Sequence, residues 1–577
     1  MGRPTSLFSF EVDEVNPPGR MRILGGGRVG GKARGLAFAE HHLQLDRTRI
    51  AGAYHHLMRI PRSVFVCSGV FEEFVDDNGL DSAMQLEFDE LQERFRAGHF
   101  RAERRDEFRH LLARMRYPLA IRSSSALEDS ADHSFAGIYL TTFIGNQGSL
   151  EERLAQFENA VRTVYASTYN DSARAYRAKR GLADDDERMS VVVQRMIGRR
   201  HQHLMYPAVA GVAISRNFYP WSPDIKREEG LMRLVFGLGT RAVGRNYARV
   251  VSLSHPNLRP EGHVVADIER YSQEVFDALN LRTNALDALR LQAVAHLDPD
   301  LRALTSIMRD DYLLDDVVLR QPGDEPVLTF NRLMAADAGL PFVVLMRTLL
   351  KNLEEICGLP VDIEFAVNMP RAGTLRPATL YLLQLRPLGV RAHHRKIHMP
   401  VVPEQNVVLT GRRSLGNGHL KNIRNVIYVR PERYLTEPVA ETVRHIAGIN
   451  RELEREGYLL IGPGRWGTRN EQLGVPVKYS HISAARAIVE VSLAGFTPEF
   501  SYGTHFFGDL FADDVMYIPV FPERRDTFNR DWLEAAPGTE HGVALRWIRS
   551  EAGLGVVVDG SESRAMVYEN AADAAPG

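Results

Sequence analysis

The stretch AIRSSSALEDSADHSFAG, residues 120–137, carries the most information about fold and function in this chain. It places Arg122 at the end of a short apolar segment, follows it with three serines, and continues through two acids to a turn that ends in glycine. The planar guanidinium of arginine offers several donors that suit phosphate oxygens. The stretch therefore predicts a strand, a loop and a turn that bind the phosphates of a nucleotide.

A second glycine-rich stretch, GGGRVGGK at residues 25–32, precedes the helix-like sequence ARGLAFAEHHL. Glycines allow the backbone to approach a phosphate, and a lysine at the start of a helix adds positive charge where free N–H groups already favour anions. A P-loop would need Ser or Thr after the lysine, but Ala33 stands there. The stretch thus indicates a phosphate site of another kind, formed by Gly30, Gly31 and Lys32.

Two apolar segments near residue 370 each contain a polar side chain at an inner position. They are Pro360–Val367, which holds Glu364, and Thr379–Leu385, which holds Gln384. As neighbouring strands, they would place a carboxylate and an amide oxygen side by side, which is a hard-oxygen site of the type that Mg²⁺ prefers next to nucleotide phosphates. Arg386 follows as a candidate phosphate clamp.

These segments together resemble the nucleotide-binding domain of the phosphoenolpyruvate synthase and pyruvate, phosphate dikinase family. The resembling motifs are GGK with Leu36 and Ala37, RSSS…ED…SFAG, QRM, AGVAIS, GLG, DIEF and QLRP, in the family's order between about residues 25 and 387. The resemblance implies a mixed α+β, ATP-grasp-like domain of two lobes that binds Mg-ATP. It assigns Glu364 and Gln384 to the metal, Lys32, Arg122 and Arg386 to the phosphates, and Gln194 and Met196 to the adenine side. Thr240 replaces the acid of the family's GLGE motif.

Chain length, net charge and cysteine content limit the number of domains, the partners and the compartment that we expect. A chain of 577 residues should form two to four domains, and we expect an ATP-grasp-like domain at 1–390, a linker at 391–405, a smaller α/β domain at 406–525 and an extension at 526–577. A net charge of −2 gives no reason to expect nucleic acid or an anionic membrane as partner. Two distant cysteines, the absence of a long apolar run and an N-terminus without a signal pattern favour the cytoplasm. A homo-oligomer is left open.

A phosphate acceptor within this chain would have to lie in its last third. A pyruvate-binding barrel needs about 250 residues, whereas about 190 follow Arg386, so we expect the pyruvate site to be absent. His505, in the sequence YGTHFF, and His481, in YSHIS, are candidate phosphoacceptors. A structural role for each histidine stays open, as does the choice for Arg465 and Trp466 between ligand binding and loop packing.

The predicted function is an ATP-dependent phosphotransferase that passes phosphate from Mg-ATP to a histidine or to a separate acceptor. An ATP-grasp ligase and a non-catalytic ATP-binding regulator are the alternatives. Simpler structural alternatives stay open for single motifs: a solvated Lys32, and an ion pair of Arg122 with Glu128 or Asp129 across a turn.

Overall fold

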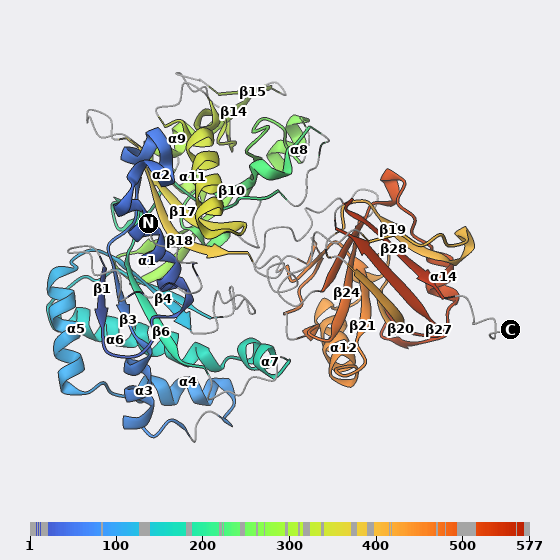
Figure 1. The fold of residues 1–577 in the computed structure, drawn as a ribbon, viewed down its shortest axis with the longest axis horizontal. Coiled ribbons are helices and arrows are strands. Elements are labelled where there is room, and N and C mark those ends of the chain that lie inside the picture. Colours follow the sequence, from blue (N-terminus) through green and yellow to red (C-terminus); the bar gives the residue numbers. More distant parts are fainter. Residues whose placement is uncertain are drawn as a thin grey trace. The chain divides into compact units, whose positions relative to one another are not determined.

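A computed structural model describes the following residues of the 577: 7, 10, 12, 21–81, 85–125, 139–179, 187–217, 222, 224–242, 248–260, 263–270, 272–294, 298–309, 312–315, 324–335, 340–370, 378–388, 397–414, 416, 418–468, 471–472, 474–478, 481–492, 515–560 and 562–570. The chain divides into two compact units, Met1–Ala173 with Ala183–Gly389, and Arg174–Leu182 with Val390–Gly577. Both units contain helices and strands (Figure 1), which confirms the expected mixed α+β class.

The first unit contains a five-stranded sheet that carries Arg122. Its strand order is β1 (Met21–Leu24), β3 (Ser63–Val66), β6 (Met189–Arg195), β4 (Leu119–Ser125) and β5 (Thr141–Ile144). Only β1 and β3 run parallel; the other neighbours are antiparallel. Around this sheet lie α3 (Ser68–Asp77), α4 (Phe88–Ala97), α5 (Ala102–Arg114) and α6 (Leu150–Ala166). Helix α7 (Asp171–Lys179) follows, and most of its residues belong to the second unit. All seven residues of β4 are buried, because this strand lies inside the sheet and α6 packs on it.

Apolar residues that recur on one face from Leu154 to Val164 predict a single helix over residues 149–181, but this helix is divided in the structure. Helix α6 starts at a capping box in which Ser149 and Glu152 bind each other's backbone N–H groups. The chain then passes through a short 3-10 turn, Ser167–Tyr169, and α7 begins anew. The side chain of Asn170 accepts the N–H of Ala173 at 2.8 Å, so a second N-cap separates the two helices.

A six-stranded sheet carries Glu364 and Gln384. Its order is β11 (Arg249–Ser252), β10 (Leu231–Val235), β9 (Val209–Ile214), β17 (Val361–Asn368), β18 (Thr379–Pro387) and β2 (Met58–Arg59). Helix α11 (Phe342–Cys357) packs on β9 and β17, and α2 (Arg47–Ala51) packs on α11. Helix α1 (Gly30–Leu45) contacts β18 of this sheet together with β4 and β6 of the first, so it links the two sheets.

The charged sequence of residues 270–316 predicts a mostly helical region, but the structure shows several strands there. It forms β12 (Val275–Asn280), β13 (Ala285–Arg290), β14 (Thr305–Arg309) and β15 (Tyr312–Leu314), with helix α9 (Pro299–Leu304) between them. Strands β12 and β13 continue through β8 (Leu204–Tyr206) to β7 (Arg199–His201), and β14 lies between β15 and β16 (Glu325–Leu328). Pairing of β12 with β13 and β8, and of β14 with β15 and β16, overrides the helical preference of the local Ala, Leu and Arg residues. Helices α8 (Val265–Arg270) and α10 (Asn331–Met334) complete the region.

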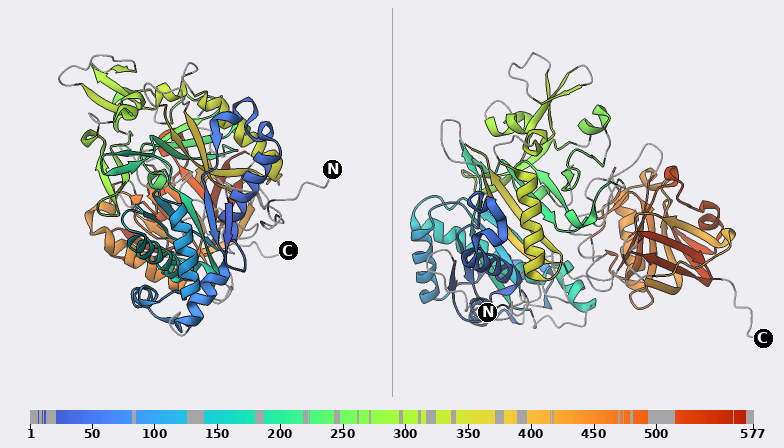
Figure 2. Two further views of the ribbon diagram at one scale, coloured as in Figure 1. Left: turned by 90° about the vertical axis from the view of Figure 1, so that its left-hand side faces the viewer. Right: turned by 45° about the horizontal axis from the view of Figure 1, so that its top comes forward.

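The second unit contains one large sheet, which Figure 2 shows as orange to red strands lying side by side. The order is β19 (Val407–Gly411), β28 (Arg564–Glu569), β27 (Leu545–Asp559), β20 (Gly418–Val429), β21 (Tyr458–Pro463), β24 (Ala485–Val491) and β25 (Met516–Val520), and β26 (Gly538–His541) pairs with β27. The unit also holds β22 (Arg465–Trp466), β23 (Gly474–Val475), α12 (Val439–Glu452) and α14 (Arg530–Ala535). Because β27 and β28 belong to this sheet, residues 545–569 are part of the unit and not an extension beyond it.

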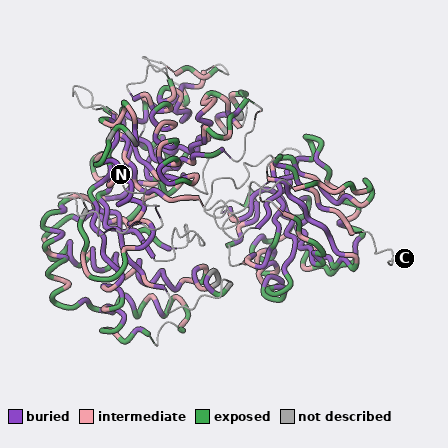
Figure 3. Tube along the Cα trace, viewed as in Figure 1, coloured by how far each residue is buried: buried purple, intermediate pink, exposed green. Residues whose placement is uncertain are grey.

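Both units bury apolar side chains along their strands, whereas exposed residues lie mainly on helices and turns (Figure 3). The core of the first unit includes apolar residues of α1, α11, β17 and β18, so the helix that starts at Gly30 is fixed to the sheet that carries Glu364. Among the described residues, no helix is both long and apolar enough to cross a membrane.

The contact between α1 and β18 predicts an unequal response to two glycine substitutions inside helices. A Cβ at Gly35 would lie 2.0 Å from the carbonyl oxygen of Leu385, whereas a Cβ at Gly448 of α12 would meet nothing within 4 Å. We expect Gly35→Ala to destabilise its unit by about 1–3 kcal/mol through overpacking. Gly448→Ala should instead stabilise its own unit by up to about 1 kcal/mol. Chemical unfolding of each variant measures both changes, and equal effects would contradict the packing described.

Candidate functional site

The first turn of α1 is fastened to the end of β4. Gly30 has φ +73°, and a Cβ there would lie 1.7 Å from the carbonyl oxygen of Ser124, so only glycine fits this approach. The Ser124 hydroxyl donates to the carbonyl oxygen of Val29 at 2.9 Å and accepts the N–H of Ala33 at 3.0 Å. One serine thus satisfies polar groups on both sides of the helix start.

Lys32 lies next to the same serine run. Its Nζ donates to the Ser123 hydroxyl at 3.2 Å, and the residue is half-buried. Because Ser123 follows Arg122 directly, the positive charges of Lys32 and Arg122 come from neighbouring positions in the structure although 90 residues separate them in sequence. Gly31 is buried in the first turn of α1, where it leaves Lys32 as the charged residue of that turn.

Arg122 is the central side chain of the site. The residue is buried, with 8% of its surface exposed. Its Nη2 atom contacts the Glu364 carboxylate and donates to Oε1 of Gln384 at 2.7 Å. The other terminal nitrogen, Nη1, donates to the carbonyl oxygen of Leu383 at 3.3 Å. A residue of the five-stranded sheet therefore binds two side chains and a backbone oxygen of the six-stranded sheet. The expected pairing of Arg122 with Glu128 or Asp129 falls on residues outside the described part of the chain.

The register of β17 and β18 places Glu364 and Gln384 together. The two residues are direct partners in this antiparallel pair, and a bulge follows between Glu364 and Phe365. Directly opposed residues point to the same face of a sheet. The Glu364 side chain keeps 30% of its surface exposed while that of Arg122 keeps 9%, so the carboxylate marks the open side of the cluster.

The donor set of Glu364 and Gln384 fits a magnesium ion that is shared with a nucleotide. Mg²⁺ is commonly held by one or two protein oxygens, with the remaining positions filled by phosphate oxygens and water. Within the described residues no group of three or more His, Cys, Asp or Glu is arranged to hold a metal by itself. A magnesium site here therefore depends on the phosphates as ligands.

Arg386 contacts an acid whose role the sequence did not reveal. Its Nε donates to Oδ2 of Asp362 at 2.9 Å, and Nη2 contacts the same oxygen. Asp362 and Arg386 are also direct strand partners. Burial raises the pKa of the Asp362 carboxyl, an effect that Arg386 opposes. The signal was present in the sequence, since Asp362 stands two residues before Glu364 and strand alternation puts both on one face.

The residues expected near the adenine have mixed surroundings. Gln194 is buried, and its Nε2 donates to the carbonyl oxygen of Leu383 at 3.2 Å, so it joins the Arg122 cluster through a shared acceptor. Met196 packs in a separate apolar cluster with Leu238 and Leu279. Its assignment to the nucleotide stays a prediction.

The threonine that replaces the family's acid has an acid partner from another strand. The Thr240 hydroxyl donates to Oδ2 of Asp277 at 2.7 Å, and Nε of Arg241 donates to Oδ1 of the same carboxylate at 2.7 Å. Asp277 lies on β12, within the region that we expected to be helical. Sequence reasoning missed it because nothing in the local sequence connects it with residue 240.

The candidate acceptors lie in the last third of the chain. His505 falls outside the described residues. The Nδ1 atom of His481 accepts the backbone N–H of Lys478 at 3.2 Å, which puts the proton of the neutral ring on Nε2. A protonated ring nitrogen has no free lone pair, so this arrangement disfavours His481 as a nucleophile.

The Gly/Pro loop that holds Arg465 and Trp466 uses its aromatic residue for packing. The Trp466 backbone N–H donates to Glu490 at 2.9 Å, its indole Nε1 donates to the carbonyl oxygen of Val489 at 3.0 Å, and the side chain is 1% exposed. Of the two uses considered for this loop, the structure supports packing for Trp466.

Arg122, Glu364 and Gln384 thus meet at one place within the first unit. Lys32 contacts Ser123, the neighbour of Arg122 in β4, and Asp362 and Arg386 lie on the same pair of strands as Glu364 and Gln384. Residues 27–405 match the model of the pyruvate phosphate dikinase, AMP/ATP-binding domain family. The chain belongs to this family. The matched residues include α1, β4, β17 and β18, the elements that build the cluster.

Curated relatives agree with this assignment. An uncharacterized phosphotransferase of Bacillus subtilis, YvkC, is 24% identical over 339 residues, which is 58% of this chain and 32% of the relative. Phosphoenolpyruvate synthase of Aeropyrum pernix is 24% identical over 297 residues, 51% of this chain and 31% of the relative. Phosphoenolpyruvate synthase of Neisseria meningitidis is 40% identical over 79 residues, which is 14% of this chain and 9% of the relative. The chain spans about a third or less of the length of these relatives.

The Asp362–Arg386 pair predicts a pH-dependent stability in one variant. Arg386→Gln leaves a buried carboxyl without its cation, so its folded pKa rises further above the unfolded value of about 3.9. An acid whose folded pKa is raised stabilises the fold when protonated, and that contribution is lost as the pH rises through the folded value. We expect the variant to lose stability relative to the wild type as pH rises from 4 to 8.

The matched control is the double variant Arg386→Gln with Asp362→Asn, which removes both charges. Its stability relative to the wild type should change much less over the same pH range. Urea unfolding at each pH measures both. A single variant that follows the pH profile of the double variant would contradict the pairing.

Proposed function

We propose that the protein is an ATP-dependent phosphotransferase that binds Mg-ATP at the cluster of Lys32, Arg122, Glu364 and Gln384, in a two-lobed ATP-grasp-like unit. The observation that supports this most is the contact of buried Arg122 with Glu364 and Gln384 across the two sheets. A cation next to a hard-oxygen pair matches what a metal-bound triphosphate requires, namely positive charge for phosphate oxygens and oxygen ligands for magnesium.

The bound nucleotide would exchange one set of contacts for another. The Arg122 guanidinium would donate to a phosphate oxygen in place of Glu364. The released carboxylate of Glu364 would then bind the metal together with Gln384. Each charge keeps a partner of opposite sign throughout, which limits the cost of desolvation. Lys32 would add a second cation, held near the phosphates by Ser123. Gln194 would hold the Leu383 backbone in place on the adenine side.

The transfer itself breaks one P–O bond of ATP and forms one bond from that phosphorus to the acceptor atom. Positioning and charge neutralisation supply most of the catalysis in such reactions. The acceptor is a histidine of this chain, with His505 preferred to His481 on the ring geometry above, or a separate substrate. Cys67 and Cys357 are both buried and form no disulfide bond with each other, and we place the protein in a reducing compartment such as the cytoplasm.

Nucleotide binding tests the cluster directly. Lys32→Met removes a half-buried charge without emptying the buried Arg122 site, and should weaken Mg-ATP binding by about 10-fold or more, the value of one charge-assisted hydrogen bond. Lys351→Met, an equivalent change at an exposed position of α11, should leave the affinity unchanged. Titration calorimetry measures both dissociation constants. No Mg-ATP binding by the wild type, or equal affinities in all three proteins, would refute the proposal.

Phosphoryl transfer needs a separate experiment. ATP labelled in turn at the β and γ phosphates is incubated with the whole chain, and acid-labile label on the protein is mapped. We expect label on His505, or label that leaves with a small-molecule acceptor. Consumption of ATP only in the presence of an amine and a carboxylate would favour a ligase, and binding without any turnover would favour a regulatory protein.

A further inference from the structure

A cavity of about 420 Å³ lies at the opposite end of the β4–β5 pair from Arg122. Leu119 pairs with Ile144 at the cavity end, and Arg122 pairs with Thr141 at the other. The cavity lies where α5 ends and α6 begins. Its lining residues are Ala113, Arg116, Asn146, Gln147, Gly148, Leu150 and Arg153. None of them belongs to the cluster proposed for ATP.

The charged residues that line this cavity are both arginines. Arg153 is 7% exposed, and its Nη1 donates to the carbonyl oxygen of Leu112 at 2.9 Å. Arg116 is exposed, and its Nε donates to the carbonyl oxygen of Ala113 at 3.2 Å. Both therefore bind the carboxyl end of α5 through one donor each. Within the described part of the chain, neither forms an ion pair with a carboxylate.

The nearby acids are engaged elsewhere. Glu151 accepts from Arg109 Nε at 2.8 Å, and Glu152 accepts the backbone N–H of Ser149 at 2.7 Å in the capping box. Burial lowers the pKa of Arg153, and repulsion from Arg116 lowers it further. A guanidinium stays charged regardless, so the cost of two like charges remains in the folded protein until an anion offsets it.

The wall of the cavity is held in a fixed shape by Asn146. This residue has φ +51° and is 2% exposed, and its Nδ2 donates to the carbonyl oxygens of Met115 at 2.6 Å and Tyr117 at 2.9 Å. Its Oδ1 is buried without a hydrogen-bond partner. An anion that also carries a hydroxyl group would supply the missing donor.

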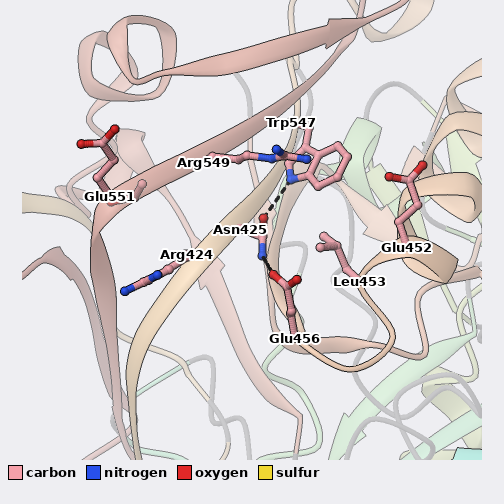
Figure 4. Close-up of a pocket in the computed structure, with 9 residues that line it drawn as sticks. Arg424, Asn425, Glu452, Leu453, Glu456, Trp547, Arg549 and Glu551 are labelled. Atoms are coloured by element: carbon pink, nitrogen blue, oxygen red, sulfur yellow. Dashed lines mark hydrogen bonds between the residues drawn. The ribbon is translucent and has the colours of Figure 1, made fainter.

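A cavity of similar volume in the second unit shows the contrast (Figure 4). Its lining includes Arg424 and Arg549 together with Glu452, Glu456 and Glu551, so its charges offset one another. Arg549 lies 4.2 Å from the centre of the Trp547 ring, and Asn425 links that indole to Glu456 by hydrogen bonds of 3.1 and 2.9 Å. This cavity is therefore lined by side chains of both charges, whereas both charged residues of the cavity at Arg153 are positive.

We propose that the cavity between α5 and α6 is a second anion site, which binds a phosphate group through Arg116 and Arg153. Phosphate suits it because guanidinium donors match its oxygens, and inorganic phosphate near neutral pH keeps at least one hydroxyl that can donate to Asn146. The site is separate from the one proposed for ATP and does not depend on it.

Calorimetric titration of the whole chain with inorganic phosphate, at constant ionic strength, tests the site. Arg116→Gln should weaken phosphate binding by about 10-fold or more, the value of one lost charge-assisted hydrogen bond. The same change at Arg153 should do so as well. Arg114→Gln is the matched control, because Arg114 is exposed, carries the same charge and does not line the cavity. Arg116 is also exposed, so its variant should fold even where that of Arg153 does not.

The outcomes separate this site from the nucleotide site. The Lys32→Met variant should still bind phosphate at the cavity, although its affinity for Mg-ATP is lowered. Phosphate binding that all three arginine variants retain would overturn the inference, as would a wild type that takes up no phosphate. Sulfate, which has no hydroxyl near neutral pH, should bind more weakly than phosphate. Glycerol phosphate in place of inorganic phosphate shows whether a free ion or a phosphorylated metabolite is preferred.

Discussion

The contact of Arg122 with Glu364 and Gln384 is the interaction on which the arrangement of the first unit's site depends. A guanidinium buried in a sheet is costly unless its charge and its donors are satisfied. Here the acceptors come from β17 and β18, which belong to the other sheet. The need to satisfy one charge therefore fixes how the end of β4 meets these two strands. It also leaves a cation and a carboxylate in contact, ready to separate around a ligand of mixed charge.

Helix α1 makes this meeting possible because its glycines let it approach both sheets. Gly30 lies against the backbone of Ser124, and Gly35 lies against the backbone of Leu385. Side chains at either position would push the helix away and take Lys32 with it. Gly30, which belongs to the proposed phosphate loop, and Gly35, which lies beyond it, thus set the packing distance between α1 and the two sheets.

The arginines discussed above differ in whether a carboxylate balances their charge. Arg122 and Arg386 have carboxylate partners, and their charges are balanced within the protein. Arg116 and Arg153 cap the end of α5, and their charge is not balanced by a carboxylate in the described residues. A balanced pair can exchange partners with little electrostatic cost, whereas an unbalanced pair gains from any anion that binds. The difference lies in the neighbours and not in the residue type.

The sequence alone determined the family, the mixed α+β class and the strands that carry Arg122, Glu364 and Gln384. These follow from local patterns: glycine next to lysine, and polar residues at fixed places in short apolar runs. It did not determine the partners of Asp362 and Thr240, the strands within residues 270–316 or the place of residues 545–569 in the second sheet. Each of these depends on pairing between separate segments of the chain, some of them adjacent hairpin strands and some far apart, and such pairing is decided by which surfaces become buried together. The charge balance at Arg153 is likewise a property of the folded chain, since only tertiary contacts show which acids are already engaged.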